Sequence, residues 1–127
     1  MNAGDTLLID APGTTLDSHL WIVISDPALD PQRVVLVNMT SHRADKDQAC
    51  VLEMGDHPYV SHRTCIEYRR AKVVRDGDME ALLGAGKISK SAPCSPALLK
   101  RIRDGVAASW MRLEVVAILQ VQKLVDF

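Results

Sequence analysis

The pattern of apolar residues changes once along this 127-residue chain, close to residue 75. Before that point, short apolar and β-branched runs alternate with turn residues, a pattern typical of strands. After it, apolar residues recur at helical spacing. We therefore expect one domain with a mainly β fold and C-terminal α structure. Residues 1–75 would form a small curled sheet or barrel, and residues 76–127 would form a helical part.

About five short strands are expected in the first part of the chain, at residues 6–9, 20–25, 33–39, 50–54 and 64–74. Turn-forming pairs such as Pro12-Gly13 and Asp26-Pro27 separate them. The second and third of these segments are apolar almost throughout. That composition indicates burial on both faces of the sheet.

Ser95-Pro96 is a strong start signal for a helix, because serine caps the first turn and proline fits its first position. Apolar residues at helical spacing follow and predict one continuous helix with a buried stripe: Leu99, Ile102, Val106, Trp110 and Leu113. A shorter helix is expected from Asp78 to Leu83, and residues 115–121 fit either a further helix or a last strand. Trp21 and Trp110 are both interpreted as core residues.

Charge and composition exclude several classes of protein. Fifteen Lys and Arg stand against sixteen Asp and Glu, so the net charge is −1 and any site for nucleic acid must be local. The three cysteines (Cys50, Cys65 and Cys94) lack the spacing of a metal knuckle or a disulfide framework. Apolar runs are far shorter than the ~20 residues that span a bilayer, and the N-terminus does not resemble a signal peptide. We expect a cytoplasmic protein without membrane contact, metal or cofactor.

The four histidines lie at the ends of predicted strands rather than within apolar runs. If residues 20–25 and 33–39 form an antiparallel hairpin, His19 and Thr40 meet at one rim of the sheet. Histidine is the side chain best suited to proton transfer near neutral pH. The sequence therefore predicts a catalytic role for His19 and Thr40.

His57 and His62 flank the loop that leads into the last predicted strand, and either can supply a second proton carrier. Further polar groups that could bind a phosphate are Ser41, His42, Arg43, Arg63 and Arg70. Imidazole, hydroxyl and guanidinium groups together suit transesterification of an RNA phosphodiester. The alternative is that these are solvated or capping residues of ordinary loops.

Several short segments follow one another in a recognisable order and spacing: Gly4-Asp5, Leu20–Ser25, Val34–Ser41, Gly86–Ser89 and Leu98–Ile102. In this layout the chain resembles the PemK/MazF family of toxin endoribonucleases. The resemblance implies an SH3-like barrel of about five to six strands with a C-terminal helix, a homodimer, and metal-independent cleavage of single-stranded RNA. It also implies an acidic antitoxin protein as partner. Thr40 matches the family's threonine, whereas His19 occupies the position of the family's arginine.

A second interpretation belongs to a different class. The same fold can serve as a non-enzymatic binding module, or as a CcdB-like toxin that targets a protein, with the C-terminal helix as its functional surface. Residues 115–127 are more apolar than a solvent-facing tail. We expect them to pack either on their own sheet or against a second copy of the chain.

Overall fold

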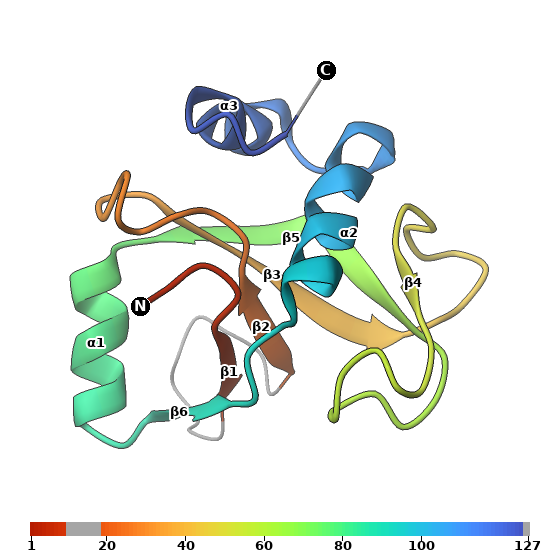
Figure 1. Ribbon diagram of the computed structural model, residues 1–127, viewed down its shortest axis with the longest axis horizontal. Coiled ribbons are helices and arrows are strands. Elements are labelled where there is room, and N and C mark those ends of the chain that lie inside the picture. The colour runs from red at the N-terminus through yellow and green to blue at the C-terminus, as the bar shows by residue number, and fades with distance from the viewer. Residues whose placement is uncertain (10–18, 126–127) are drawn as a thin grey trace.

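Six antiparallel strands form one sheet in the computed structural model, which describes residues 1–9 and 19–125. The strands are β1 (Thr6–Ile9), β2 (Leu20–Val23), β3 (Val34–Ser41), β4 (Val51–Leu52), β5 (Thr64–Val74) and β6 (Ile88–Ser91). The helices are α1 (Asp76–Gly84), α2 (Pro96–Gly105) and α3 (Leu113–Val121), with a 3₁₀ turn, η1 (Val106–Ala108), after α2. The predicted mainly β fold with C-terminal α structure is confirmed (Figure 1). The expected turn at Pro12-Gly13 lies outside the described residues.

The strand order is β4-β5-β3-β2-β1-β6. β4 pairs only with β5, and β6 pairs only with β1. Within the described ranges the sheet is therefore open, with β4 and β6 at its edges, and the expected closure into a barrel is not confirmed.

Alternate residues of β3 belong to two different apolar clusters, because successive side chains of a strand point to opposite faces. Val35, Val37 and Met39 belong to the larger cluster, which α2 and α3 cover. Val34 and Leu36 belong to the smaller cluster, which α1 covers. Figure 1 shows α2 and α3 over β3 and β5, and α1 at the other end of the sheet near β6. The predicted burial of this strand on both faces is confirmed.

The pairing between β3 and β5 contains an irregularity in the middle of β5. Leu36 pairs with Lys72, and Asn38 pairs with Glu67, so residues 68–71 stand opposite a single residue of β3. Tyr68 and Ala71 are buried, and the two residues between them, Arg69 and Arg70, are exposed. The irregularity therefore places two adjacent arginines on the outside of the strand.

The C-terminal part contains separate helices where one continuous helix was expected. Ser95 caps α2 as predicted, since its Oγ accepts a hydrogen bond from the Leu98 amide at 3.1 Å. The chain leaves the helix at Ser109, whose backbone is extended and whose hydroxyl donates to the Val106 carbonyl at 2.7 Å. The predicted stripe of buried residues therefore ends at Val106, and Leu113 is 82% exposed.

The interpretation of Trp110 as a core residue is wrong, because the helix has ended before it and its side chain is 49% exposed. Trp21 is fully buried, as expected. Residues 115–121 form the helix α3, which resolves the alternative left open by the sequence. Four of its residues are buried in the chain's own core: Val115, Val116, Ile118 and Leu119. This packing accounts for these four apolar residues, whereas Val121 at the end of the helix is 70% exposed.

The segment between residues 76 and 95 also differs from the expectation of helix throughout. α1 begins at Asp76, two residues before the predicted cap, and ends at Gly84. Gly86 then adopts a φ of +71°, which turns the chain so that β6 can pair with β1. A glycine permits this left-handed conformation at no steric cost. β6 escaped prediction because only one of its four residues, Ile88, is buried apolar.

Gly105 allows α2 to approach β5 closely. A Cβ atom at this position would collide with the Tyr68 hydroxyl and would lie 3.2 Å from the Ala49 carbonyl oxygen. The Tyr68 hydroxyl in turn donates a 2.7 Å hydrogen bond to the Ile102 carbonyl. Burial raises the pKa of Tyr68, so this phenol stays protonated as a donor.

We predict that Gly105→Ala destabilises the protein by about 1–3 kcal/mol, although alanine is the better helix former by about 1 kcal/mol. The cause is the collision of the new methyl group with Tyr68. Urea unfolding measures the effect. Gly77→Ala in α1 is the control, since its added Cβ meets no atom within 4 Å and should leave stability equal or higher. Equal stabilities of Gly105→Ala and the wild type would contradict the close approach.

Candidate functional site

A pocket of about 290 Å³ opens at the end of the sheet where β3 ends and where β2 and β5 begin. Its lining contains two imidazoles, four aliphatic hydroxyls, one phenol and one thioether. The lining residues are His19, Met39, Thr40, Ser41, Tyr59, Ser61, His62 and Thr64. The three strands supply one side of the pocket, and the loop between β4 and β5 supplies the other. No lysine or arginine is among these residues.

The register of β2 and β3 explains why His19 and Thr40 share this pocket. Trp21 pairs with Asn38 in the antiparallel ladder. His19 lies two residues before Trp21, and Thr40 lies two residues after Asn38, so they reach the same end of the hairpin. The expectation that His19 and Thr40 meet at one rim is confirmed, since both line the pocket. Neither side chain has a hydrogen-bond partner among the described residues.

His62 stands between two serine hydroxyls. Its Nε2 lies 2.8 Å from Ser41 Oγ, and its Nδ1 lies 3.1 Å from Ser61 Oγ. In a neutral imidazole one of these nitrogens donates and the other accepts, and in an imidazolium both donate. The Thr64 hydroxyl donates to the His62 carbonyl at 2.9 Å, which anchors the backbone of the loop at the start of β5. The pocket therefore holds a histidine that can take or give a proton through either ring nitrogen.

His57 lies outside the pocket lining and is 3% exposed. Its Nε2 is 2.6 Å from the Ala92 carbonyl oxygen, so this nitrogen carries the proton. Its Nδ1 accepts a hydrogen bond from the Tyr59 amide at 3.1 Å. Both ring nitrogens thus hold the loop that carries Tyr59 against the chain after β6. This arrangement gives His57 a structural position, and leaves His62 as the histidine that shares the pocket with His19.

The other predicted phosphate ligands lie outside the pocket lining as well. His42 Nε2 lies 2.6 Å from Gln48 Oε1, and Arg43 lies 3.6 Å from Asp45. Arg63 is paired with Glu53 at 2.7 Å, and Arg70 lies 3.7 Å from Glu67. Of the predicted binding residues, Ser41 alone lines the pocket with the catalytic candidates.

Three hydroxyl residues and a methionine of the lining were missed from the sequence: Met39, Tyr59, Ser61 and Thr64. Ser61 could have been predicted from the sequence, because it is next to His62 in the chain. Tyr59 and Thr64 could not, since their positions depend on how the loop between β4 and β5 folds back over the sheet.

The cysteines do not provide a nucleophile at this site. Cys65 is the strand partner of Thr40 but is fully buried, and burial raises the pKa of its thiol to about 11. Burial likewise raises the pKa of Cys94 to about 11, and raises that of Cys50. Thiols with these pKa values are protonated at neutral pH and are poor nucleophiles.

Comparisons of the chain with protein-family models, with curated proteins and with solved structures found no match. Within residues 1–9 and 19–125, no group of three or more His, Cys, Asp or Glu is placed to hold a metal ion. In the same part of the chain, no helix has the length and apolar character needed to cross a membrane.

Asp56 fixes the loop between β4 and β5 to α2. Its carboxylate accepts a 2.8 Å hydrogen bond from the Glu53 amide and another, also 2.8 Å, from Arg101 Nη1. The backbone hydrogen bond, and then Arg101, hold the pKa of Asp56 below its ordinary value of 3.8. The same loop carries Tyr59, Ser61 and His62 into the pocket.

We predict that Asp56→Asn lowers the free energy of unfolding at neutral pH by about 1 kcal/mol. A depressed carboxyl pKa contributes stability above the ordinary pKa, and that contribution is lost as pH falls through the lower pKa of the folded protein. The deficit of the variant should therefore shrink as pH falls from 4 to about 2 in urea titrations. Asp45→Asn, at a 76% exposed side chain, is the control and should show no such pH-dependent deficit. A deficit for Asp56→Asn that does not change with pH would contradict this role.

Proposed function

We propose that this protein is an endoribonuclease toxin that cleaves single-stranded RNA by attack of the 2′-hydroxyl on the adjacent phosphodiester. The observation that carries the proposal is the shared pocket of His19, Thr40 and His62. Two imidazoles around one phosphate can carry the two proton transfers of this reaction, with no need for a metal ion. The order of short segments that resembles the PemK/MazF family supports the same reaction.

In the proposed mechanism, His62 acts as the base. Its Nε2 accepts the proton of the attacking 2′-hydroxyl, which takes the place that Ser41 Oγ holds at 2.8 Å. A hydrogen bond from Nδ1 to Ser61 Oγ fixes the required tautomer. The new bond joins the 2′-oxygen to phosphorus.

His19 acts as the acid in the same proposal. As an imidazolium it gives its proton to the 5′-oxygen as the bond from phosphorus to that oxygen breaks. The Thr40 hydroxyl donates a hydrogen bond to a non-bridging phosphate oxygen, where negative charge grows in the transition state. The products are a 2′,3′-cyclic phosphate and a free 5′-hydroxyl, so every proton is accounted for.

The resemblance alone carries the remaining parts of the proposal: an SH3-like arrangement of the strands, a homodimer, an acidic antitoxin partner and a cytoplasmic location. The consecutive antiparallel pairing of β1, β2 and β3 is in keeping with such an arrangement. The chain's own core already covers the buried residues of α3, so a dimer contact would use other surfaces.

We predict that the purified protein cleaves a single-stranded RNA pool in the presence of EDTA and leaves 2′,3′-cyclic phosphate ends. The single-turnover rate should fall about 10²- to 10⁴-fold in His62→Ala and in His19→Ala. It should fall less in Thr40→Ala. Ser89→Ala on the exposed part of β6 is the control. RNA that stays intact at high protein excess would refute the nuclease and favour the non-enzymatic module.

We also predict a bell-shaped dependence of the cleavage rate on pH, because the mechanism needs one neutral and one protonated imidazole. The rate should fall on both sides of its optimum. His62→Ala should flatten the acidic limb, and His19→Ala should flatten the alkaline limb, in whatever activity remains. A profile that rises to a plateau, with no alkaline limb in the wild type, would exclude His19 as the acid.

A further inference from the structure

Trp110 presents half of its indole on the surface, with an arginine stacked on it. The side chain is 49% exposed, and the Arg69 guanidinium carbon lies 5.4 Å from the centroid of its ring. Large aromatic side chains are normally buried, so an exposed one next to a cation is informative. Phe, Trp and Tyr make up only 4% of this chain.

Several hydrogen bonds hold the backbone around Trp110 in place. The buried carboxylate of Asp47 accepts from the Trp110 amide at 2.8 Å and from the Ala49 amide at 2.9 Å. On the other side, Arg112 Nη2 donates to the Ala71 carbonyl of β5 at 2.9 Å. The backbone that carries the ring is thus held between the loop that follows β3 and the irregular part of β5, and Arg69 lies over the ring. A side chain on an ordered backbone loses less entropy when it binds a ligand.

Four cationic residues belong to the chain segments that flank Trp110, and one of them, Arg69, lies over its ring. We call this set the Trp110 surface, and it consists of Lys46, Arg69, Arg70, Trp110 and Arg112. The carboxylate between Lys46 and Arg70 belongs to Glu67, whose side chain is only 7% exposed. Glu114 is the acidic neighbour of Arg112, at 3.8 Å and 74% exposed. With the buried carboxylate of Asp47, three acidic groups stand against these four cations, so the local net charge is +1, whereas the whole chain has a net charge of −1.

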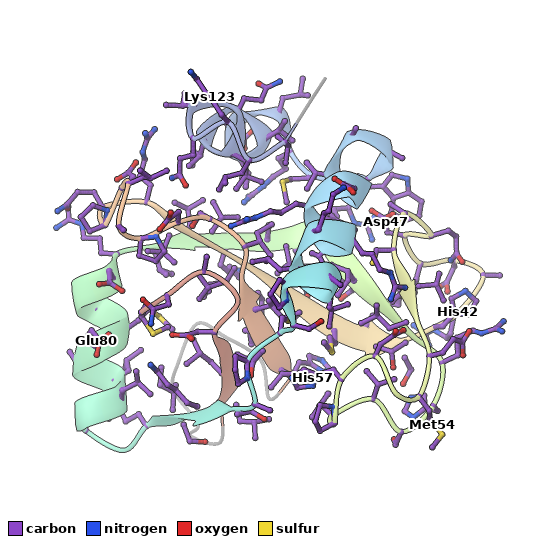
Figure 2. All side chains as sticks on the ribbon, viewed as in Figure 1. His42, Asp47, Met54, His57, Glu80 and Lys123 are labelled. Atoms are coloured by element: carbon purple, nitrogen blue, oxygen red, sulfur yellow. The ribbon has the colours of Figure 1, made fainter. Side chains whose placement is uncertain are left out.

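The Trp110 surface is joined to the pocket by a short piece of chain. Ser41 lines the pocket, His42 donates its amide to the Arg63 carbonyl at 3.1 Å, and Asp47 binds Trp110. Figure 2 labels His42 and Asp47 along this loop, with Asp47 close to the end of α2. Asp47 is the sixth residue after Ser41, so their Cα atoms are at most about 20 Å apart.

We propose that the Trp110 surface binds the single-stranded RNA that flanks the cleaved phosphodiester. One base stacks on the exposed indole, and the surrounding arginines and Lys46 neutralise phosphates. Aromatic rings with nearby arginines suit single strands of any sequence, because every base presents a flat π face. An acidic peptide would use the charges and leave the ring without a matching partner, so RNA is the better fit. The inference names the substrate path of the proposed nuclease, and therefore rests on that function.

The test separates binding from cleavage by use of a 2′-O-methyl oligonucleotide, which has no 2′-hydroxyl to attack phosphorus. A fluorescein-labelled single strand of about twelve nucleotides is titrated with protein and followed by anisotropy. Trp110→Ala should weaken binding about fivefold to a hundredfold, and Trp110→Phe should weaken it less. Binding should also quench tryptophan fluorescence in the wild type, and this quench should be absent in Trp110→Phe, where Trp21 is buried.

The arginines are tested together as Arg69→Ala/Arg70→Ala. Loss of two phosphate contacts should lower the slope of log K against log salt by about 1.4. The matched control is Arg75→Ala/Lys87→Ala, which removes the same charge from exposed positions at the two ends of α1. Thermal unfolding monitored by circular dichroism checks the fold of each variant. The backbone bond from Trp110 to Asp47 does not need the indole, so Trp110→Ala should stay folded.

Each outcome decides one proposal. Weaker binding by the Trp110 and Arg69/Arg70 variants, with the control unchanged, supports the Trp110 surface whether or not RNA is cleaved. If binding is the same in all variants while the wild type cleaves RNA, the surface proposal fails and the nuclease stands. If a polyglutamate peptide of equal length binds through these arginines and the oligonucleotide does not bind, the surface serves an acidic protein and the RNA proposal is overturned.

Discussion

The position of β3 between β2 and β5 is the constraint on which the rest of this structure depends. β3 is buried on both faces along most of its length, and it pairs antiparallel with a neighbour on each side. Antiparallel pairing brings the end of one strand to the start of the next. The C-terminal end of β3 consequently collects His19 from before β2 and Thr64 from the start of β5. The pairing of the buried strands thus specifies where the polar residues of the rim lie, and Met39 belongs both to the pocket lining and to the larger apolar cluster.

The sequence predicts the parts of this arrangement that follow from the spacing of apolar residues and from the antiparallel pairing of neighbouring strands. The two continuously apolar segments give β2 and β3, and a short connection makes them a hairpin, so the meeting of His19 and Thr40 follows. The Ser95 cap likewise predicts the start of α2. Features that depend on tertiary contacts are not predictable in the same way. The 3₁₀ turn η1 that follows α2 ends where the Ser109 hydroxyl donates a hydrogen bond to the Val106 carbonyl. In the sequence, however, apolar residues at helical spacing continue beyond that point.

Residue type and position in the sequence do not distinguish the structural role of one histidine from the proposed catalytic role of another. All four lie near strand ends, and the chain gives no reason to separate His57 from His62. The structure separates them by hydrogen bonding: both ring nitrogens of His57 are bound to the backbone, whereas in the described part of the chain the ring nitrogens of His62 are bound to serine hydroxyls. Backbone groups are fixed partners, and exposed hydroxyls are exchangeable ones. A buried histidine that braces a loop and a rim histidine that can transfer protons therefore look alike in sequence.

The distribution of charge separates the two parts of the molecule to which the proposals assign a role. The described residues of the pocket lining include neither lysine nor arginine, so in the proposed mechanism the phosphate depends on imidazole and hydroxyl groups for its hydrogen bonds. The proposed binding charges, those of Lys46 and of the arginines near Trp110, lie outside this lining, on a surface that the loop after β3 connects to the pocket. The two proposals thus assign attraction of the polyanion to one surface and proton transfer to another, so variants of the arginines should change binding and variants of the pocket histidines should change the chemical step.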